Sequence, residues 1–209
     1  MSVMDRLANN LGRKDDVPNQ ELAKELAETK NTSDIAEIAA GLKDKDRRIQ
    51  SNCIKVLYEI GYIDPSLIAA YSDVFVDLLH SSNNRLVWGS MIALSTVADL
   101  AAHELYPLRE EIQKAVDKGS VITQDAGIKA LAAIAAADST YREELFPYLL
   151  DHLSSCRPKD VAQRAEKIAA AVGITNRQAF SSMLRKRMEY LKPPQVKRLE
   201  NVLRSVEKR

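Results

Sequence analysis

The sequence contains the segment Ile49-Gln-Ser-Asn-Cys53-Ile-Lys-Val56-Leu57, in which apolar residues follow helical spacing around one small residue. The same pattern returns after 37 residues as Leu86-Val-Trp-Gly-Ser90-Met-Ile-Ala93-Leu94. It returns again after a further 37 residues as Thr123-Gln-Asp-Ala-Gly127-Ile-Lys-Ala130-Leu131. Three segments of one type at one period predict equivalent helices in a repeated unit.

Further positions keep the period of 37 residues. Two apolar columns are Leu42, Leu79, Val116 and Leu153, and Leu57, Leu94, Leu131 and Ile168. A third column precedes each repeated helix with residue types that cap helix N-termini: Asp46, Asn83 and Ser120. One helical hairpin cannot bury its apolar stripe alone, so neighbouring hairpins must stack. We therefore predict an all-α, right-handed α-α superhelix (an α-solenoid) of two-helix units.

We expect a single α-solenoid domain over residues 1–209. Regular units are predicted at 34–67, 71–104, 108–141 and 145–178, so that four repeats fill residues 34–178. Residues 1–30 and 181–209 keep helical periodicity but lose the register, as N-terminal capping helices and a basic C-terminal capping unit would. Pro18, Pro107 and Pro147 are predicted to lie at helix starts, where the missing N–H costs nothing.

The repeated second-helix pattern resembles HEAT repeats, and the resemblance covers most of the chain. It differs at one position, since Gln50, Val87 and Gln124 stand where the family usually has a basic residue. Armadillo repeats have three helices in each unit, so the two-helix units predicted here favour HEAT repeats. The resemblance implies that the first helices line the convex side and the second helices the concave side.

The composition excludes several classes of protein. Hydrophobic residues make up 45% and charged residues 28%, which is typical of a globular chain and not of a disordered or membrane protein. The net charge of +1 indicates no global attraction to a polyanion, and seven glycines are too few for a glycine-rich phosphate-binding enzyme. The richest apolar run, residues 130–137, is far too short to span a bilayer, so no membrane partner is expected.

The two cysteines indicate a reducing compartment, and we expect a cytoplasmic protein without disulfides. Cys53 lies on a core column beside Leu57 and is predicted to be a small buried residue. Cys156 lies in the turn before Pro158 and is predicted to be a surface thiol.

The histidines do not support metal binding. His80, His103 and His152 lack a second His at i+4 or a cysteine at ligand spacing. The single pair His103-Glu104 differs from the several His-Glu pairs with which HEAT-repeat deoxyhypusine hydroxylases hold two irons. We therefore predict no metal and no cofactor.

One enzymatic alternative rests on the resemblance. HEAT-like DNA glycosylases hold DNA against several tryptophans and use a catalytic Asp, whereas this chain has only Trp88, with Asp125 one repeat later. Because fold is often shared without function, we predict no catalytic residue and keep a glycosylase-type enzyme as a third alternative.

The second helices carry the predicted binding surface, on the concave side. Trp88 is its anchor, because tryptophan is enriched at binding hot spots. The predicted surface consists of Arg48, Lys55, Arg85, Trp88, Ile92, Lys129 and Glu166. Its cations, indole and isoleucine suit an extended peptide with acidic and apolar residues. We therefore predict a non-enzymatic protein–protein interaction scaffold.

The C-terminal segment concentrates positive charge. From Ile174 to Arg209 there are ten basic residues and three acidic ones, a net charge of +7 against −6 for residues 1–173. The plainer interpretation is a solvated capping surface. The alternative is a nucleic-acid-associating protein that uses this basic C-terminal unit, and such binding would weaken steeply with salt.

Overall fold

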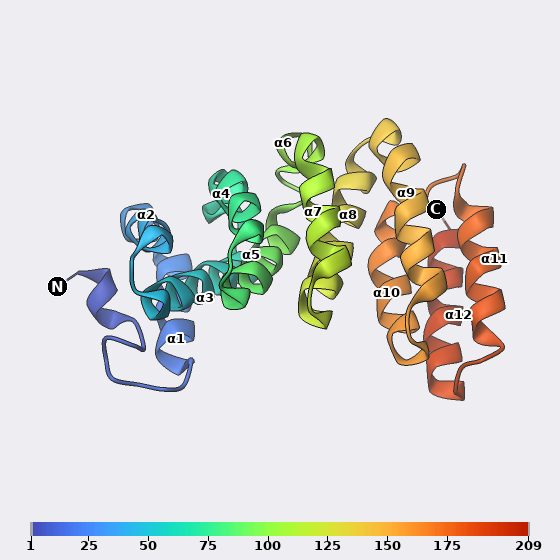
Figure 1. Cartoon of the computed structure of the whole chain (residues 1–209). Helices are drawn as coiled ribbons and strands as arrows, with labels where there is room; N and C mark the ends of the chain where they lie inside the picture. Colours follow the sequence, from blue (N-terminus) through green and yellow to red (C-terminus); the bar gives the residue numbers. More distant parts are fainter. Residues whose placement is uncertain (1, 209) are drawn as a thin grey trace. The chain divides into compact units, whose positions relative to one another are not determined.

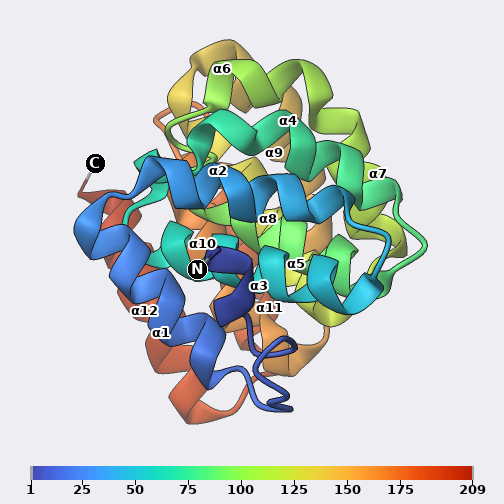
Figure 2. The ribbon, with the colours of Figure 1, turned by 90° about the vertical axis from the view of Figure 1, so that its left-hand side faces the viewer.

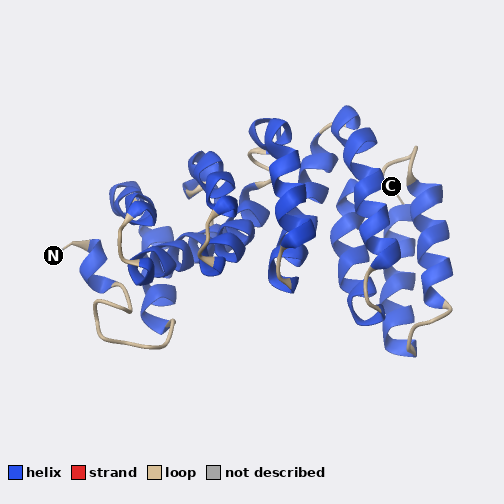
Figure 3. Ribbon diagram, viewed as in Figure 1, coloured by secondary structure: helices blue, strands red, loops and turns tan. Residues whose placement is uncertain are grey.

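The computed structural model describes residues 2–208, which form twelve α-helices and eight short 3₁₀ helices (Figure 1, Figure 3). No strand is present in that range, so the all-α prediction is confirmed. The helices group into two compact units, which divide between Gly127 and Ile128. None of the helices between residues 2 and 208 is long and apolar enough to cross a membrane.

The first unit contains seven complete α-helices and the start of an eighth. The complete ones are α1 (Val17–Thr29), α2 (Thr32–Ala40), α3 (Arg47–Ile63), α4 (Ser72–Asp77), α5 (Asn84–Val97), α6 (Ala102–Leu105) and α7 (Arg109–Lys118). The 3₁₀ helices are η1 (Val3–Arg6), η2 (Gly41–Lys43), η3 (Pro65–Leu67), η4 (Ala69–Tyr71), η5 (Leu78–His80) and η6 (Tyr106–Leu108). Helix α8 (Val121–Ala137) carries the division between the units.

The helices of the first unit form two layers. Helix α3 packs against both α1 and α5, so these three helices make one layer. Helix α4 packs against α6, and Figure 2 shows α2, α4 and α6 side by side in the other layer. The layers meet where α2 packs against α3 and α4 packs against α5. Alternation of a first and a second helix along the chain thus produces the two layers.

The repeated columns behave as predicted. Leu57, Leu94, Leu131 and Ile168 are all fully buried. The cap column also does what its residue types predict: the Asp46 carboxylate accepts from the N–H of Arg48 at 2.7 Å, and the Asn83 side chain accepts from that of Arg85 at 3.1 Å. Burial and capping recur together, which supports the period of 37 residues.

A short helical segment precedes the first helix in two repeats. The 3₁₀ helices η3 and η4 lie before α4, and α6 with η6 lies before α7. Pro65 begins η3, and Pro107 lies in η6. These prolines interrupt the helical hydrogen-bonding pattern and keep each segment short. The segments add a third helical piece to the two predicted helices of these repeats.

The second unit contains the rest of α8 and four further α-helices. They are α9 (Ser139–Ser155), α10 (Val161–Ile168), α11 (Arg177–Met188) and α12 (Pro193–Glu207), with the 3₁₀ helices η7 (Pro158–Asp160) and η8 (Ala169–Ala171). Helix α12 packs against α10 and α11, and α9 packs against the same two helices. Phe180 and Leu184 of α11 and Leu199 and Val206 of α12 are fully buried in this unit.

The prediction that Pro147 starts a helix is wrong, because α9 begins eight residues earlier and continues through it. Proline lacks the N–H that would bond to the carbonyl one turn before. Leu145, Phe146 and Leu149 are buried on both sides of Pro147, and their packing keeps the helix continuous.

The prediction that Cys156 is a surface thiol is also wrong. Its side chain is buried, and Sγ donates to the carbonyl oxygen of Leu153 at 3.4 Å. Burial raises the pKa of Cys156, although Arg164 and Arg187 oppose the shift. Cys53 is buried as predicted, and burial raises its pKa to about 12.

Gly127 lies where two helices approach too closely for a side chain. A Cβ atom there would collide with Cγ2 of Val116 on α7 and lie 3.2 Å from Sδ of Met91 on α5. We expect Gly127→Ala to lower the free energy of unfolding by about 1–3 kcal/mol through overpacking, against a gain of about 1 kcal/mol in helix propensity. Urea unfolding followed by circular dichroism measures the difference.

A second background tests the cause of the Gly127 effect. In Val116→Ala protein the colliding methyl group is gone, so Gly127→Ala should cost clearly less there than in the parent chain. Equal or higher stability of Gly127→Ala in the parent chain would show that the helices do not need a glycine at this contact.

Candidate functional site

The second helices of the first unit carry a cluster of aromatic and charged side chains. We call it the α3–α5 surface and define it by Lys55, Tyr58, Glu59, Tyr62, Arg85, Trp88 and Ile92, with Asp16 before α1. Helical spacing explains the arrangement, because residues three, four and seven apart lie on one side of a helix. The α3 members and the α5 members follow this spacing, and the packing of α3 against α5 brings the two rows together.

The aromatic part of this surface is a contiguous group of three rings. The Tyr58 and Trp88 ring centroids lie 6.1 Å apart with the planes tilted by 52°. Tyr62 meets Tyr58 edge-on at 6.0 Å and is itself 57% exposed. Tyr58 is buried, and burial raises its pKa, whereas Trp88 is half-buried. Tyr58 therefore packs against the indole, and part of the indole remains accessible.

The charged part of the surface connects three helices. Lys55 Nζ lies 2.6 Å from Glu59 Oε1, and it also lies 4.0 Å from the Asp16 carboxylate. Arg85 Nη2 lies 3.7 Å from the same Asp16 carboxylate, so Asp16 joins α3 and α5. The Arg85 guanidinium also lies 5.9 Å from the Trp88 ring centroid, within cation–π range.

Lys55 is not the accessible cation that the sequence indicated. It is only 9% exposed, and Glu59, one helical turn later, already binds its ammonium. Burial opposes the charged form, but the hydrogen bond with Glu59 and the neighbouring Tyr58 outweigh it and raise the pKa of Lys55. Its ammonium also lies 4.9 Å from the Tyr58 ring centroid, so Lys55 positions that ring and is satisfied within the protein.

The other predicted residues are distributed more widely. Arg48 is exposed at the start of α3 and pairs with its own capping residue, Asp46, at 3.1 Å. Ile92 is half-buried one turn beyond Trp88 on α5. Lys129 is exposed on α8 and Glu166 is exposed on α10, both in the second unit, where Glu166 pairs with Arg198 at 2.7 Å. Of the predicted set, Lys55, Arg85 and Trp88 form one contact network.

Four members of the α3–α5 surface are absent from the sequence prediction: Asp16, Tyr58, Glu59 and Tyr62. Tyr58 and Glu59 could have been found, because they follow Lys55 by three and four residues on a predicted helix. Asp16 could not, because it lies outside the repeats and reaches the surface only through the packing of α1 on α3.

Some of the basic C-terminal residues form hydrogen bonds or ion pairs within the protein. Arg187 donates to the carbonyl oxygens of Ser154 and Cys156, and so holds the turn after α9. Arg185 pairs with Glu207 at 3.3 Å. The exposed lysines Lys186, Lys192, Lys197 and Lys208 form no ion pair with the part of the chain that the structure describes. These lysines and the exposed Arg204, which likewise forms no ion pair within residues 2–208, supply accessible positive charge.

Residues 2–208 contain no group of three or more His, Cys, Asp or Glu side chains that could hold a metal ion. His80 lies instead 3.4 Å from Glu111.

Comparison with known proteins identifies the fold. No family model and no curated protein sequence matches the chain. One similar solved structure is an engineered protein with a TM-score of 0.67 and 19% identity, over 100% of this chain and 98% of that one. Another is a designed armadillo repeat protein with a TM-score of 0.65 and 15% identity, over 98% of both chains.

A third similar structure is described as a computationally designed armadillo repeat protein for modular peptide recognition. It has a TM-score of 0.62 and 18% identity, and the match covers 88% of this chain and 85% of that one. The fold is therefore an armadillo/HEAT-like α-solenoid. At this level of identity the similarity establishes the fold alone.

Proposed function

We propose that the first unit is a non-enzymatic interaction module that binds an extended peptide segment of a partner protein on the α3–α5 surface. The observation that carries this proposal is the half-buried Trp88, held against Tyr58 and beside Arg85. A partly accessible tryptophan on a rigid support is a typical hot spot for protein binding. The peptide-recognition purpose of a designed protein with the same fold supports a peptide as the ligand.

The side chains of the α3–α5 surface determine which peptide residues would fit it. Trp88, Tyr62 and Ile92 offer apolar area for an aliphatic or aromatic side chain. Arg85 lies 3.7 Å from the Asp16 carboxylate and its side chain is half-exposed, so its guanidinium can bind a peptide carboxylate. Lys55 keeps its own partner and maintains the shape of the site. A short segment with one bulky apolar and one acidic residue fits this arrangement.

We also propose that the protein functions in a reducing compartment such as the cytoplasm. Cys53 and Cys156 are both buried free thiols, in accordance with a protein that does not use disulfides.

The proposal is tested with peptides selected from a displayed random library by the full chain. We expect Trp88→Ala to lower the affinity for a selected peptide by about tenfold or more, because it removes the apolar anchor. Arg48→Ala should have a smaller effect on the same affinity. Calorimetric titration measures the affinities, and circular dichroism confirms that helicity is unchanged.

Tyr190→Ala provides the matched control, since it removes a 77% exposed aromatic ring in the second unit. It should leave the affinity for the peptide unchanged. Peptides that bind Trp88→Ala as tightly as the parent chain would locate the binding surface elsewhere.

The basic C-terminal unit supports a second candidate function, association with nucleic acid. The observation that favours it is the set of exposed lysines without an ion-pair partner in the described residues. Binding of a DNA fragment would then fall steeply as salt is added, because phosphate contacts release counterions. Peptide binding dominated by Trp88 would change much less with salt.

A further inference from the structure

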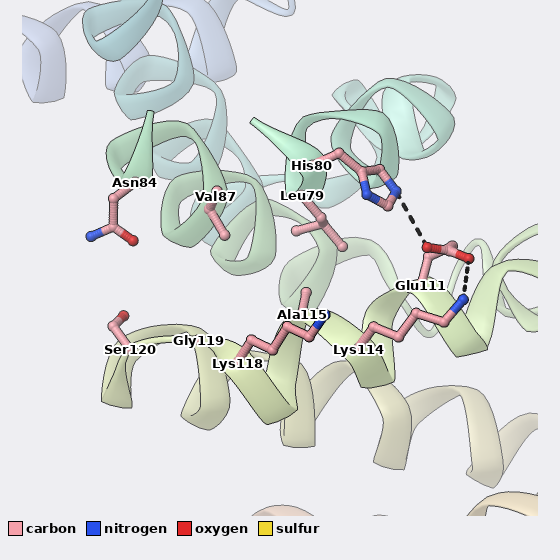
Figure 4. Close-up of a pocket in the computed structure, with 10 residues that line it drawn as sticks. All are labelled: Leu79, His80, Asn84, Val87, Glu111, Lys114, Ala115, Lys118, Gly119 and Ser120. Carbon is pink, nitrogen blue, oxygen red and sulfur yellow. Dashed lines mark hydrogen bonds and ion pairs between the residues drawn. The ribbon is translucent and has the colours of Figure 1, made fainter. Parts of the chain in front are cut away.

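A pocket of about 310 Å³ lies in the first unit, away from the α3–α5 surface (Figure 4). It is formed by η5 and the start of α5 on one side and by α7 and the turn before α8 on the other. Val87 lines it, whereas the neighbouring Trp88 belongs to the α3–α5 surface, because consecutive helical residues point about 100° apart. The pocket is therefore a separate site.

The pocket has an apolar middle and polar ends. Figure 4 shows Leu79 and Val87 facing Ala115 and the stem of Lys118 across the middle. At one end the side chains of Asn84 and Ser120 point toward each other from the two sides. The opposite end holds His80, Glu111 and Lys114. A ligand lying along the pocket would meet apolar contacts and the Lys118 side chain in its centre, and further hydrogen-bonding groups at its two ends.

The charges at the end near Glu111 balance within the protein. Lys114 Nζ lies 2.8 Å from Glu111 Oε1, and His80 Nε2 lies 3.4 Å from Glu111 Oε2. The hydrogen bond with Lys114 lowers the pKa of Glu111, so this carboxylate is ionised and neutralises Lys114. Glu111 therefore leaves no negative charge free to attract a cation.

The charge of Lys118 is not balanced in this way. Within residues 2–208 no carboxylate lies within ion-pair distance of its ammonium, and the Asn84 side chain has no hydrogen-bond partner. The Ser120 hydroxyl accepts from the N–H of Thr123 at 3.3 Å and shares a second hydrogen bond with the Thr123 hydroxyl at 3.1 Å. The pocket thus carries a net positive charge, with an ammonium and an amide able to donate to a ligand.

We propose that this pocket binds a small organic anion whose apolar body rests on Leu79, Val87 and Ala115 and whose carboxylate or phosphate meets Lys118. The volume sets the size, since each water-sized group occupies about 30 Å³ and about ten such groups fill the space. The volume is at the lower end for ligand pockets, which fits a small molecule.

The probe for this proposal is phenylacetate, which matches the size and combines a ring with one carboxylate. Phenylacetamide has the same shape without the charge, and inorganic phosphate has the charge without the apolar body. In a heteronuclear NMR titration of the full chain, phenylacetate should shift the amide signals of Gly119 and Ser120. Phenylacetamide and phosphate should each bind several-fold more weakly.

Variants assign the binding to the pocket. Lys118→Gln should lower the affinity for phenylacetate by about tenfold, as expected for the loss of a charged hydrogen bond. Lys45→Gln is the matched control, because it removes the same charge from an exposed lysine outside the pocket. Ala115→Leu should abolish binding by filling the apolar middle, with circular dichroism to confirm folding. Trp88→Ala should leave phenylacetate binding unchanged, which separates this site from the α3–α5 surface.

Several results would overturn the proposal. Equal affinity for phenylacetate and phenylacetamide would remove the role of Lys118, and equal affinity for inorganic phosphate would remove the role of the apolar middle. Unchanged Gly119 and Ser120 signals at millimolar phenylacetate would exclude the site. An acidic peptide that shifts the same signals and binds more tightly than phenylacetate would identify a protein segment, not a small molecule, as the ligand.

Discussion

Replacing Phe180 by alanine is expected to lower the free energy of unfolding by about 3–5 kcal/mol, the largest effect that we predict. Phe180 is fully buried in α11, and its ring lies 6.4 Å from that of Phe146 on α9 in an edge-to-face arrangement. The variant loses the apolar burial of a whole ring and the contact with Phe146, and leaves a cavity between α9 and α11. Urea unfolding followed by circular dichroism measures the loss.

Ile174→Ala is the control for Phe180→Ala, because Ile174 is a large apolar residue of the same unit that is 84% exposed. Its replacement should change stability by no more than about 0.5 kcal/mol. If both variants lose the same small amount, Phe180 does not hold the second unit together.

Leu94→Ala is expected to lower the free energy of unfolding by about 2–5 kcal/mol. Leu94 is fully buried in α5 and belongs to the column of Leu57, Leu131 and Ile168. Truncation removes apolar contacts where α5 packs against its neighbours, and the backbone of a stacked helix cannot close the gap fully. Trp88 is the one tryptophan of the sequence, so its fluorescence during urea unfolding reports on this unit.

Leu100→Ala is the control for Leu94→Ala, since Leu100 follows α5 and is 54% exposed. If Leu94→Ala, like Leu100→Ala, lowered the free energy of unfolding by less than about 1 kcal/mol, the repeat register would be contradicted. The column that contains Leu94 would then not be a set of core residues.

The repeat and its core could be predicted from the sequence. Apolar residues at helical spacing, small residues at Cys53, Ser90 and Gly127, and capping residues at one period all depend on local geometry or on contacts between equivalent neighbours. Each repeat meets nearly the same surroundings, so a column that is apolar in every copy must be buried in every copy. Leu57 and Leu94 confirm this for an apolar column, and Gly127 lies at a close helix contact that has no room for a side chain.

The candidate site could be predicted only in part. Trp88 was identifiable because it interrupts a column of small or polar residues, Ser51, Asp125 and Ala162. Whether its ring is accessible depends on Tyr58, which comes from the neighbouring helix. Lys55 looked like an accessible cation from helical position alone, but Glu59 binds it and the surrounding helices bury it.

Tertiary packing decided the features that depend on contacts between segments far apart in sequence. Asp16 reaches Lys55 and Arg85 only because α1 packs on α3. The pocket beside Lys118 exists only where α5 and α7 leave space between their ends. Helix formation and the burial of a repeated column follow from short-range periodicity, which the sequence contains. Side-chain pairing and empty volume depend on how the helices meet in space, and that becomes known only when the chain has folded.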